Sequence, residues 1–383
     1  MRIGIDARML GPIVGGGGLG RYVEELVREL GKLDHKHRTV LFLKRENFDF
    51  DSLALSKGDQ TQSGSVEKRL ADIHWYTIKE QIVMPWLIDR ARLDLVHFPH
   101  WNVPLLVRTP FVVTIHDLIL LEEPLSAKAT TRHPAIFALK RAAQRLILKN
   151  ALWRARAIIA VSNHTKSSIL KFFPWVPEKK IHVIYEGLTP LVHAPKRVPE
   201  AHSSPPLSLL YVGNAYPHKN LEMLLAAFQR LRTHHPNLSL TLAGRGDVFY
   251  ERLKQKTLAM GLAPHVRFVL NPTDASLSEL YVAADLYVFP SRHEGFGLPP
   301  LEAMSAGVPV VSSNAGAMPE ILGDAAAYFD PRNVHDMTRT IQLTLTDAHL
   351  RERLIQKGFE QIQRYSWSKM ARKILDIYQR HAS

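Results

Sequence analysis

Two glutamates lie eight positions apart in a segment whose residue types suit sugar binding. Glu294 and Glu302 enclose the sequence GFGLPPL, which follows the apolar run LYVFP. Each carboxylate can accept several hydrogen bonds, as the adjacent hydroxyls of a sugar would offer. The two glycines remove side-chain bulk, and the two prolines suit the first turn of a helix, where a missing N–H costs nothing. We therefore expect free backbone N–H groups at the start of this helix to face an anion.

A lysine and an arginine follow two other apolar runs in the same half of the chain. Lys219 lies in YVGNAYPHKNL, after Gly213, and Arg245 lies between two glycines in LAGRGD. An ammonium group can stabilise negative charge that grows in a transition state. An isolated lysine after a strand is more often simply solvated, and Arg245 is as easily a surface residue as a ligand.

The first half of the chain offers a glycine-rich segment and polar residues at strand ends. GPIVGGGGLGRYVEEL, residues 11–26, places its glycines between an expected strand and an expected helix, where the backbone can approach a phosphate closely. TIHDL places His116 and Asp117 just past a buried strand. Another strand end carries His100, Trp101 and Asn102. Aromatic and amide groups suit sugar binding, although the packing of a loop explains them equally well.

These residues need a scaffold that brings the ends of several strands together. Short β-branched apolar runs alternate with amphipathic stretches, as in parallel sheets covered by helices. Strands are expected at 1–10, 39–44, 94–98, 111–115, 157–161, 208–213, 239–244, 265–270, 286–291 and 308–314. Helices are expected at 22–33, 137–157, 220–235, 248–262, 276–285, 300–307 and 367–383. The fold class is therefore α/β, with two doubly wound, Rossmann-like domains that bind ligands beyond the carboxyl ends of their strands and face each other across a cleft.

The length of 383 residues also suits two domains. Five prolines between Pro190 and Pro206 mark a linker. We expect an N-terminal domain at 1–190, the linker at 191–206 and a C-terminal domain at 207–365. A final helix at 366–383 is expected to be able to pack back on the first domain.

Basic residues are concentrated before the linker. Lysine and arginine number 49 against 36 acidic residues, a net charge of +13, and residues 124–177 contain ten basic residues and no acidic one. Arg141, Arg145 and Lys149 share a face of the helix expected there. That face is either plainly solvated or, in the sharper interpretation, part of a segment 128–156 that contacts an anionic membrane surface. We expect no nucleic-acid partner, because no nucleic-acid module accompanies the basic residues.

Composition excludes several classes of protein. The chain has no cysteine, which excludes a disulfide scaffold, a thiolate metal site and a cysteine nucleophile. It has no run of about 18 apolar residues that could span a membrane. We expect a cytoplasmic protein that is able to attach to the inner face of the cytoplasmic membrane.

The stretch SRHEGFGLPPLEAMSAGVPVVSSNAGAMPEIL, residues 291–322, resembles the signature of retaining glycosyltransferases of the GT-B fold, in particular glycosyltransferase family 4. YVGNAYPHKNL resembles the segment of that family whose lysine binds the donor diphosphate. The resemblance implies that Glu294 contacts hydroxyls of the donor sugar, that Glu302 holds the ribose of the nucleotide and that Lys219 holds the diphosphate. It also implies that His116 lies beside the donor sugar and that the first glycine loop faces the donor phosphate.

The expected site follows from these motifs. The expected catalytic residues are Lys219, Glu294 and His116. The expected donor-binding residues are Gly16, Gly17, Gly18, Gly213, Asn214, Lys219, Arg245, Gly295, Phe296, Gly297, Leu298 and Glu302. The weaker acceptor-binding candidates are His100, Trp101 and Asn102.

One position departs from the family pattern. Many members carry an arginine directly after the loop glycine, where this chain has Asn214. An amide can donate a hydrogen bond but supplies no charge. Arg245 or His218 can compensate, and the sequence leaves the choice between them open.

The resemblance implies transfer of a sugar from a nucleotide-activated donor to a hydroxyl, with retention of the anomeric configuration and with no metal or other cofactor. The two motifs are most similar to those of bacterial polysaccharide mannosyltransferases. This favours GDP-mannose as donor and a lipid-linked glycan, such as an O-antigen intermediate, as acceptor. Rhamnosyl, glucosyl and N-acetylglucosaminyl transferases are alternatives. A nucleotide-sugar 2-epimerase is less favoured, because it should lack the full Gly-Phe-Gly stretch between the two glutamates. A non-catalytic sugar-nucleotide-binding protein is less favoured, because Lys219, Glu294 and Glu302 are all present.

Overall fold

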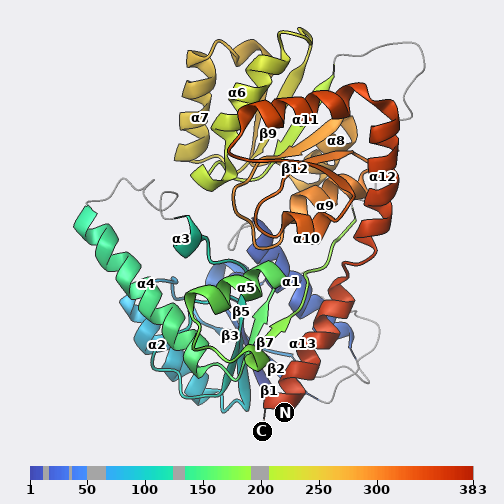
Figure 1. The fold of residues 1–383 in the computed structure, drawn as a ribbon. Coiled ribbons are helices and arrows are strands. Elements are labelled where there is room, and N and C mark those ends of the chain that lie inside the picture. The colour runs from blue at the N-terminus through green and yellow to red at the C-terminus, as the bar shows by residue number, and fades with distance from the viewer. Residues whose placement is uncertain (12–16, 34–36, 50–65, 124–133, 191–206, 383) are drawn as a thin grey trace. The chain divides into compact units, whose positions relative to one another are not determined.

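The structure is a computed structural model in which residues 1–11, 17–33, 37–49, 66–123, 134–190 and 207–382 are described. The chain divides into two compact units. Unit 1 comprises Met1–Leu118, Thr130–Gly187 and Ser366–Ser383, and unit 2 comprises Ile119–Ala129 and Leu188–Tyr365. Each unit contains one parallel sheet flanked by helices (Figure 1). The expected α/β class with two doubly wound sheets is confirmed.

Unit 1 is built on a seven-stranded parallel sheet in the order β3-β2-β1-β4-β5-β6-β7. Its strands are β1 (Arg2–Asp6), β2 (Arg38–Leu43), β3 (Val66–Leu70), β4 (Leu95–Phe98), β5 (Phe111–Ile115), β6 (Ala157–Ala160) and β7 (Ile181–Val183). Its helices are α1 (Gly17–Lys32), α2 (Ile78–Arg90), α4 (Pro134–Arg154), α5 (Asn163–Phe172) and α13 (Trp367–His381), with single 3-10 turns at Arg45–Asn47 and Glu178–Lys180. Every residue of β4, β5 and β6 is buried, which explains why these strands appear in the sequence as continuous apolar runs.

Unit 2 is built on a six-stranded parallel sheet in the order β10-β9-β8-β11-β12-β13. Its strands are β8 (Ser208–Val212), β9 (Ser239–Gly244), β10 (Val266–Leu270), β11 (Leu286–Phe289), β12 (Val310–Ser313) and β13 (Ala326–Phe329). Its helices are α3 (Ile119–Glu122), α6 (Leu221–Leu231), α7 (Val248–Ala259), α8 (Asp274–Ala283), α9 (Leu298–Ser305), α10 (Met318–Leu322), α11 (Val334–Thr346) and α12 (Ala348–Ile362), with 3-10 turns at Pro217–Lys219 and Ala263–His265. Tyr211, Tyr287 and Phe289 form a buried aromatic row across its central strands.

One segment belongs to a different unit from the one that the sequence analysis assigned. Residues 119–129, expected within an N-terminal domain at 1–190, are part of unit 2. The end of α3 lies against a loop of unit 2. Glu122 Oε2 lies 3.4 Å from His293 Nδ1, and Glu123 Oε1 lies 3.5 Å from His293 Nε2. The expected linker, 191–206, lies outside the described residues.

Helix α13 completes unit 1 from the far end of the chain. It packs on α1 (Figure 1). Hydrogen bonds join the buried His97 ring to Tyr378 Oη at 2.6 Å and to Thr114 Oγ1 at 2.8 Å. Burial lowers the pKa of His97 to about 3, so this ring is neutral at physiological pH. Gly187 has room for no side chain, because a Cβ there would lie 2.2 Å from the backbone nitrogen of Trp367.

Among the described residues, no helix combines the length and the apolar character that crossing a bilayer requires.

Candidate active site

The strand order of both sheets reverses beside the first strand, between β1 and β4 in unit 1 and between β8 and β11 in unit 2. Loops that leave the carboxyl ends of such strand pairs diverge and create a space where ligands bind. Lys219 follows β8 and Glu294 follows β11, so the two residues that the motifs singled out both lie at the switch point of unit 2. Gly17 follows β1 and His100 follows β4, at the corresponding point of unit 1.

Lys219 and Glu294 form an ion pair. Lys219 Nζ donates to Glu294 Oε1 at 2.5 Å, and the two side chains are only 13% and 11% exposed. Lys219 ends the 3-10 turn Pro217–Lys219, and the next residue, Asn220, has the left-handed backbone conformation that redirects the chain into α6. The Asn220 amide donates to the carbonyls of Pro290 and Pro331, which ties this turn to the end of β11. The structure thus brings Lys219 and Glu294 together from segments 75 residues apart.

The loop after β8 depends on a close approach of two backbones. A Cβ on Gly244 would lie 1.9 Å from the carbonyl oxygen of Gly213, and the Tyr250 hydroxyl donates to that same oxygen at 2.8 Å. The Tyr211 hydroxyl donates to the carbonyl of Asn214 at 2.7 Å. These contacts fix the backbone at Gly213 and Asn214, where the sequence analysis placed donor binding.

The structure separates the two candidates for the cation that Asn214 does not supply. His218 is buried, and burial together with the neighbouring Lys219 ammonium lowers its pKa to about 4. His218 is therefore neutral at physiological pH and adds no positive charge. Arg245 is exposed at the end of β9. Of these two residues, Arg245 is the one that can neutralise an anion.

Glycines set the path of the loop that carries Glu294. Gly297 has φ +93° and caps α9, and Gly316 has φ +62°. A Cβ on Gly316 would lie 2.8 Å from the backbone nitrogen of Glu294, and the Glu294 carbonyl accepts from Ala317 N at 3.1 Å. The expected prolines, Pro299 and Pro300, occupy the first turn of α9 and remove two of its N–H donors. Gly316 was not predicted to be a site residue, although it lies within the motif at residues 291–322.

Glu302 is buried in the second turn of α9. The Tyr281 hydroxyl donates to its Oε2 atom at 2.9 Å, which orients the carboxylate from α8. Two other expected donor-binding side chains are part of the core instead. Phe296 packs edge-on against Tyr365 with ring centroids 5.4 Å apart, and Leu298 is buried. A ligand could therefore contact Phe296 and Leu298 only through their backbone atoms. The same holds for Gly295, which is buried beside Glu294.

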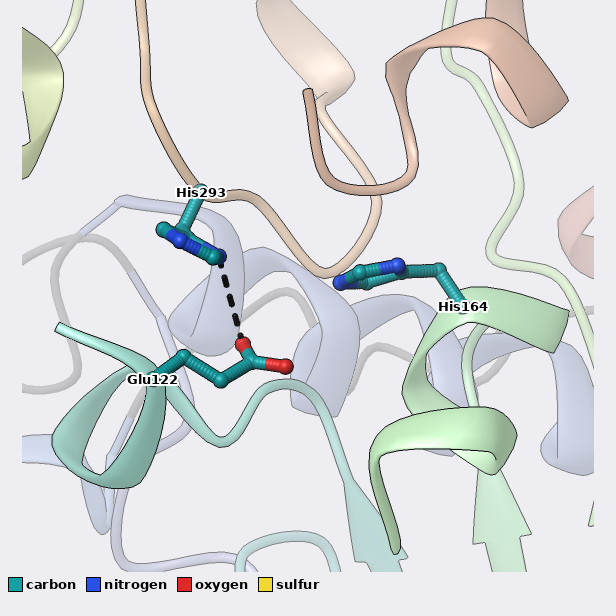
Figure 2. A group of neighbouring side chains, drawn as sticks. All are labelled: Glu122, His164 and His293. Atoms are coloured by element: carbon teal, nitrogen blue, oxygen red, sulfur yellow. Dashed lines mark ion pairs between the residues drawn. The ribbon is translucent and has the colours of Figure 1, made fainter. Parts of the chain in front are cut away.

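The residue before Glu294 lies against two carboxylates. Figure 2 shows the His293 ring beside the Glu122 carboxylate of α3, and Glu123 lies on the other ring nitrogen. The third residue drawn, His164, belongs to α5 in unit 1. Glu122 and Glu123 therefore contact the loop between β11 and α9 at His293, whereas Gly316 lies against the backbone of the next residue, Glu294.

The glycine-rich segment of unit 1 is described in part. Gly16 lies outside the described residues. Gly17 and Gly18 are exposed and form the first turn of α1, which begins five residues earlier than expected. Gly20 lies against the preceding loop, because a Cβ there would be 2.4 Å from the Gly11 carbonyl oxygen. The first turn of α1 therefore presents backbone N–H groups without side chains, and no acidic residue lies in it.

His116 uses both ring nitrogens inside the protein. Nδ1 lies 2.9 Å from Glu186 Oε1, and Nε2 lies 3.0 Å from the carbonyl oxygen of Pro99. Its backbone carbonyl accepts from the Thr165 hydroxyl at 3.2 Å. The ring is consequently not placed to exchange a proton with a substrate through a free nitrogen.

The acceptor-binding candidates belong to a buried polar network. Asn102 donates to Glu80 Oε2 at 2.8 Å, and the fully buried Glu80 pairs through Oε1 with Arg8 at 2.6 Å. Trp101 is buried beside His100, with ring centroids 4.9 Å apart. The geometry of Trp101 and Asn102 is that of residues that shape the loop after β4. Glu80 escaped notice in the sequence, because its partners lie 72 and 22 positions away.

Two family models cover almost the whole chain. The model for Glycosyltransferase Family 4 matches residues 16–190, and the model for Glycosyl transferases group 1 matches residues 194–361. The chain is a family 4 glycosyltransferase. Among curated relatives, this glycosyltransferase is 27% identical to O-antigen chain mannosyltransferase B of Escherichia coli, over 94% of its own length and 95% of the relative. It is 28% identical to glycogen synthase of Mycobacterium tuberculosis, over 94% of its own length and 91% of that protein.

Solved structures show that the fold is GT-B. Sucrose-phosphate synthase from Thermosynechococcus elongatus superposes with a TM-score of 0.76 at 20% identity, covering 99% of this chain and 98% of that one. WaaG, a glycosyltransferase involved in lipopolysaccharide biosynthesis, superposes with a TM-score of 0.70 at 16% identity, covering 98% and 99%. At these identities the superpositions establish the architecture alone.

Proposed function

We propose that this glycosyltransferase moves mannose from GDP-mannose, with retention, to a hydroxyl of a growing, lipid-linked bacterial polysaccharide such as an O-antigen. The observation that carries the transferase chemistry is the Lys219–Glu294 pair at the switch point of unit 2. Two relatives at 27% and 29% identity, O-antigen chain mannosyltransferases of Escherichia coli and Salmonella typhimurium, support mannose as the donor sugar. A glycogen synthase is similar to the same degree, at 28% identity, so overall sequence similarity does not identify the donor sugar.

In the proposed reaction the bond between the anomeric carbon and the diphosphate breaks, and the acceptor oxygen bonds to that carbon on the same face. The proton of the acceptor hydroxyl passes to the departing phosphate oxygen. Lys219 meets the negative charge that grows on the diphosphate, and Arg245 adds to it. Glu294 orients the sugar hydroxyls, and Glu302, held by Tyr281, orients the ribose. No metal takes part, so chelation with EDTA should leave turnover unchanged.

A donor panel tests the proposal. The purified protein is mixed with GDP-mannose and with the dTDP-rhamnose, UDP-glucose and UDP-N-acetylglucosamine alternatives, and with GDP, UDP and dTDP alone. We expect GDP to raise the melting temperature most, because a ligand stabilises the state that it binds, and GDP-mannose to be consumed with a lipid-linked glycan acceptor. A greater shift from UDP or dTDP would overturn GDP-mannose in favour of another donor. No consumption of any donor, in the presence of acceptor, would overturn the transferase itself.

The proposal includes attachment to the inner face of the cytoplasmic membrane through unit 1. On α4, Arg145 and Lys149 of the expected basic face are exposed and Arg141 is partly exposed. Residues 128–133 of the expected membrane segment lie outside the described residues. Leu146 and Trp153 on the same helix are also exposed, so α4 combines positive charge with large apolar side chains. This composition favours a surface of anionic lipid.

Helix α2 adds an apolar ridge, Ile78, Ile82 and Trp86, at four-residue spacing. These side chains are 82%, 61% and 53% exposed, although most residues of their size are buried. Leu105 links α2 to α4: its N–H donates to Gln81 Oε1 at 2.9 Å, and its carbonyl accepts from Arg154 Nη1 at 2.7 Å. The apolar ridge and the basic face therefore lie on helices bonded to one loop.

Replacing the apolar ridge by serine (Ile78→Ser, Ile82→Ser, Trp86→Ser) should weaken binding to vesicles of phosphatidylcholine and phosphatidylglycerol at least tenfold, because the buried apolar area is lost. Reversing the basic face (Arg141→Glu, Arg145→Glu, Lys149→Glu) should abolish the preference for anionic over neutral vesicles. Co-sedimentation measures both.

The matched control replaces three exposed apolar residues of unit 2, Val248, Leu258 and Leu343, by serine. Its binding should equal that of the wild type. Unchanged binding of both unit 1 variants would contradict membrane attachment. A concentration-dependent dimer that the ridge variant loses would assign the ridge to self-association instead.

A further inference from the structure

The hydrogen bonds of His116 determine where its protons are. A carbonyl oxygen only accepts, so the 3.0 Å contact with Pro99 requires a proton on Nε2. A carboxylate also only accepts, so the 2.9 Å contact between Nδ1 and Glu186 Oε1 requires a second proton between those two atoms. With both in place, the ring is an imidazolium that donates twice, and Glu186 carries its counter-charge.

The surroundings make Glu186 the group on which this state depends. Glu186 is buried, and the His116 side chain is 18% exposed. Tyr22 of α1 meets the ring edge-on with centroids 4.6 Å apart, and Thr165 of α5 bonds the backbone carbonyl. Burial alone disfavours the imidazolium. The hydrogen bond and charge of Glu186, with smaller contributions from Pro99 and Asp117, outweigh it, so the pKa of His116 is raised.

The other titratable groups around the ring do not compete for the proton. Burial, with the nearby His116 charge, lowers the pKa of both His97 and His100 to about 3. Burial raises the pKa of the Tyr22 phenol, so it stays neutral. Three histidines therefore lie near one another, and of these only the one paired with a carboxylate has a raised pKa.

We propose that Glu186 is a positioning residue of the transfer reaction, which holds His116 as a fixed cation with both N–H groups turned into the protein. The exposed part of the ring then presents positive charge, and no lone pair, at the carboxyl end of β5. His116 in this state attracts an anionic group of the donor and takes no proton from the acceptor. The inference rests on the proposed function, because it assigns His116 to that reaction.

Glu186→Gln tests the proposal, because glutamine preserves size and removes the charge. Side-chain NMR of isotope-labelled histidine, assigned with His116→Gln, follows the protonation of His116 in both proteins. We expect the wild-type ring to keep its second proton to a higher pH than an ordinary histidine does, and the Glu186→Gln ring to lose that proton at a lower pH than the wild type. The basic limb of the pH profile of kcat should move to lower pH by the same interval.

The loss of turnover in Glu186→Gln should depend on pH. A raised pKa preserves the cation as pH rises, so losing Glu186 should cost most activity between the lowered pKa of the variant and the raised pKa of the wild type, and little above both. Glu186→Asp keeps the charge and should restore part of the high-pH activity. Glu178→Gln, which removes an exposed acid of the same unit paired with Lys166, should change neither readout.

The outcomes separate this inference from the proposed function. A wild-type His116 ring that loses its second proton below the ordinary histidine pKa of 6.5 overturns the inference without any transfer assay. A protonated wild-type ring with an unchanged pH profile in Glu186→Gln overturns it too, because the pair is then purely structural. Failure of every donor in the panel removes the proposed function, while the NMR measurement still decides the state of His116. If Glu186→Gln does not fold, the Glu186→Asp variant and the NMR titration of His116 in the wild type decide whether the inference holds.

Discussion

Lys219→Ala is expected to lower kcat/KM for sugar transfer by about 10²- to 10³-fold, the usual loss when one group that stabilises transition-state charge is removed. The ammonium is mostly buried and bonded to Glu294 at 2.5 Å, so its charge is little screened by solvent. Its removal also leaves the Glu294 carboxylate without its counter-ion, next to the place where an anionic leaving group must develop. Steady-state kinetics with a saturating acceptor measure the loss.

The matched control is Lys254→Ala. Lys254 lies in the same unit and faces Glu251 at 3.8 Å, but both side chains are substantially exposed. Surface pairs of this kind contribute little, so its activity should equal that of the wild type. Activity of Lys219→Ala within twofold of the wild type would remove the lysine from the mechanism.

Combining Lys219→Ala with Glu294→Gln sharpens this test. Two residues in direct contact do not act independently, so the double variant should lose much less than the product of the single losses. Strictly multiplicative losses would mean that the pair seen between Lys219 and Glu294 has no part in the reaction.

Gly244→Ala is expected to destabilise unit 2 by at least about 2–3 kcal/mol, because a methyl group must fit where a backbone oxygen lies 1.9 Å away. The Gly213 carbonyl cannot yield without breaking its bond from Tyr250 and shifting the end of β8. That shift also moves Asn214, so nucleotide binding should weaken together with stability. Urea unfolding and the thermal shift with GDP measure the two effects.

Gly246→Ala provides the comparison within the same loop. A Cβ on Gly246 would meet its nearest atoms, the Asn271 amide nitrogen and a Leu270 methyl, at 3.4 Å. These are side-chain atoms at ordinary contact distance, so stability should change by less than about 0.5 kcal/mol. Equal losses for the two alanines would show that the close approach at Gly244 does not limit this loop.

The sequence predicted the central strands and one edge strand, β10, and missed the other three edge strands. β4, β5, β6, β11 and β12 are buried along their whole length, which produces the apolar runs from which they were expected. The strands that were not expected, β3, β7 and β13, are all sheet edges. β3 has the sequence VEKRL and alternates between partly exposed and exposed residues. An edge strand buries only part of its surface, so its composition does not distinguish it from a loop.

The site shows the same division between local and long-range information. Glu294, Gly297 and Lys219 were predictable, because each lies in a contiguous motif whose turn geometry needs those residue types. The partners that orient the site residues or set their charge were not predictable from the sequence. Glu186 reaches His116 from 70 positions away, and Tyr281 reaches Glu302 from 21. The neutral state of His218 depends on burial, which only the folded chain provides.

The packing of α13 also governs the order in which the protein is able to finish folding as it is made. Trp367 covers Gly187, and Tyr378 bonds the buried His97, so strands made early await side chains made last. All of residues 188–365, by contrast, leave the ribosome before α13 does. Domains generally fold as units during synthesis, in the order in which their residues emerge. In this chain that order is reversed for the final step: unit 2 has its sheet complete while unit 1, begun first, still lacks the helix that closes its core.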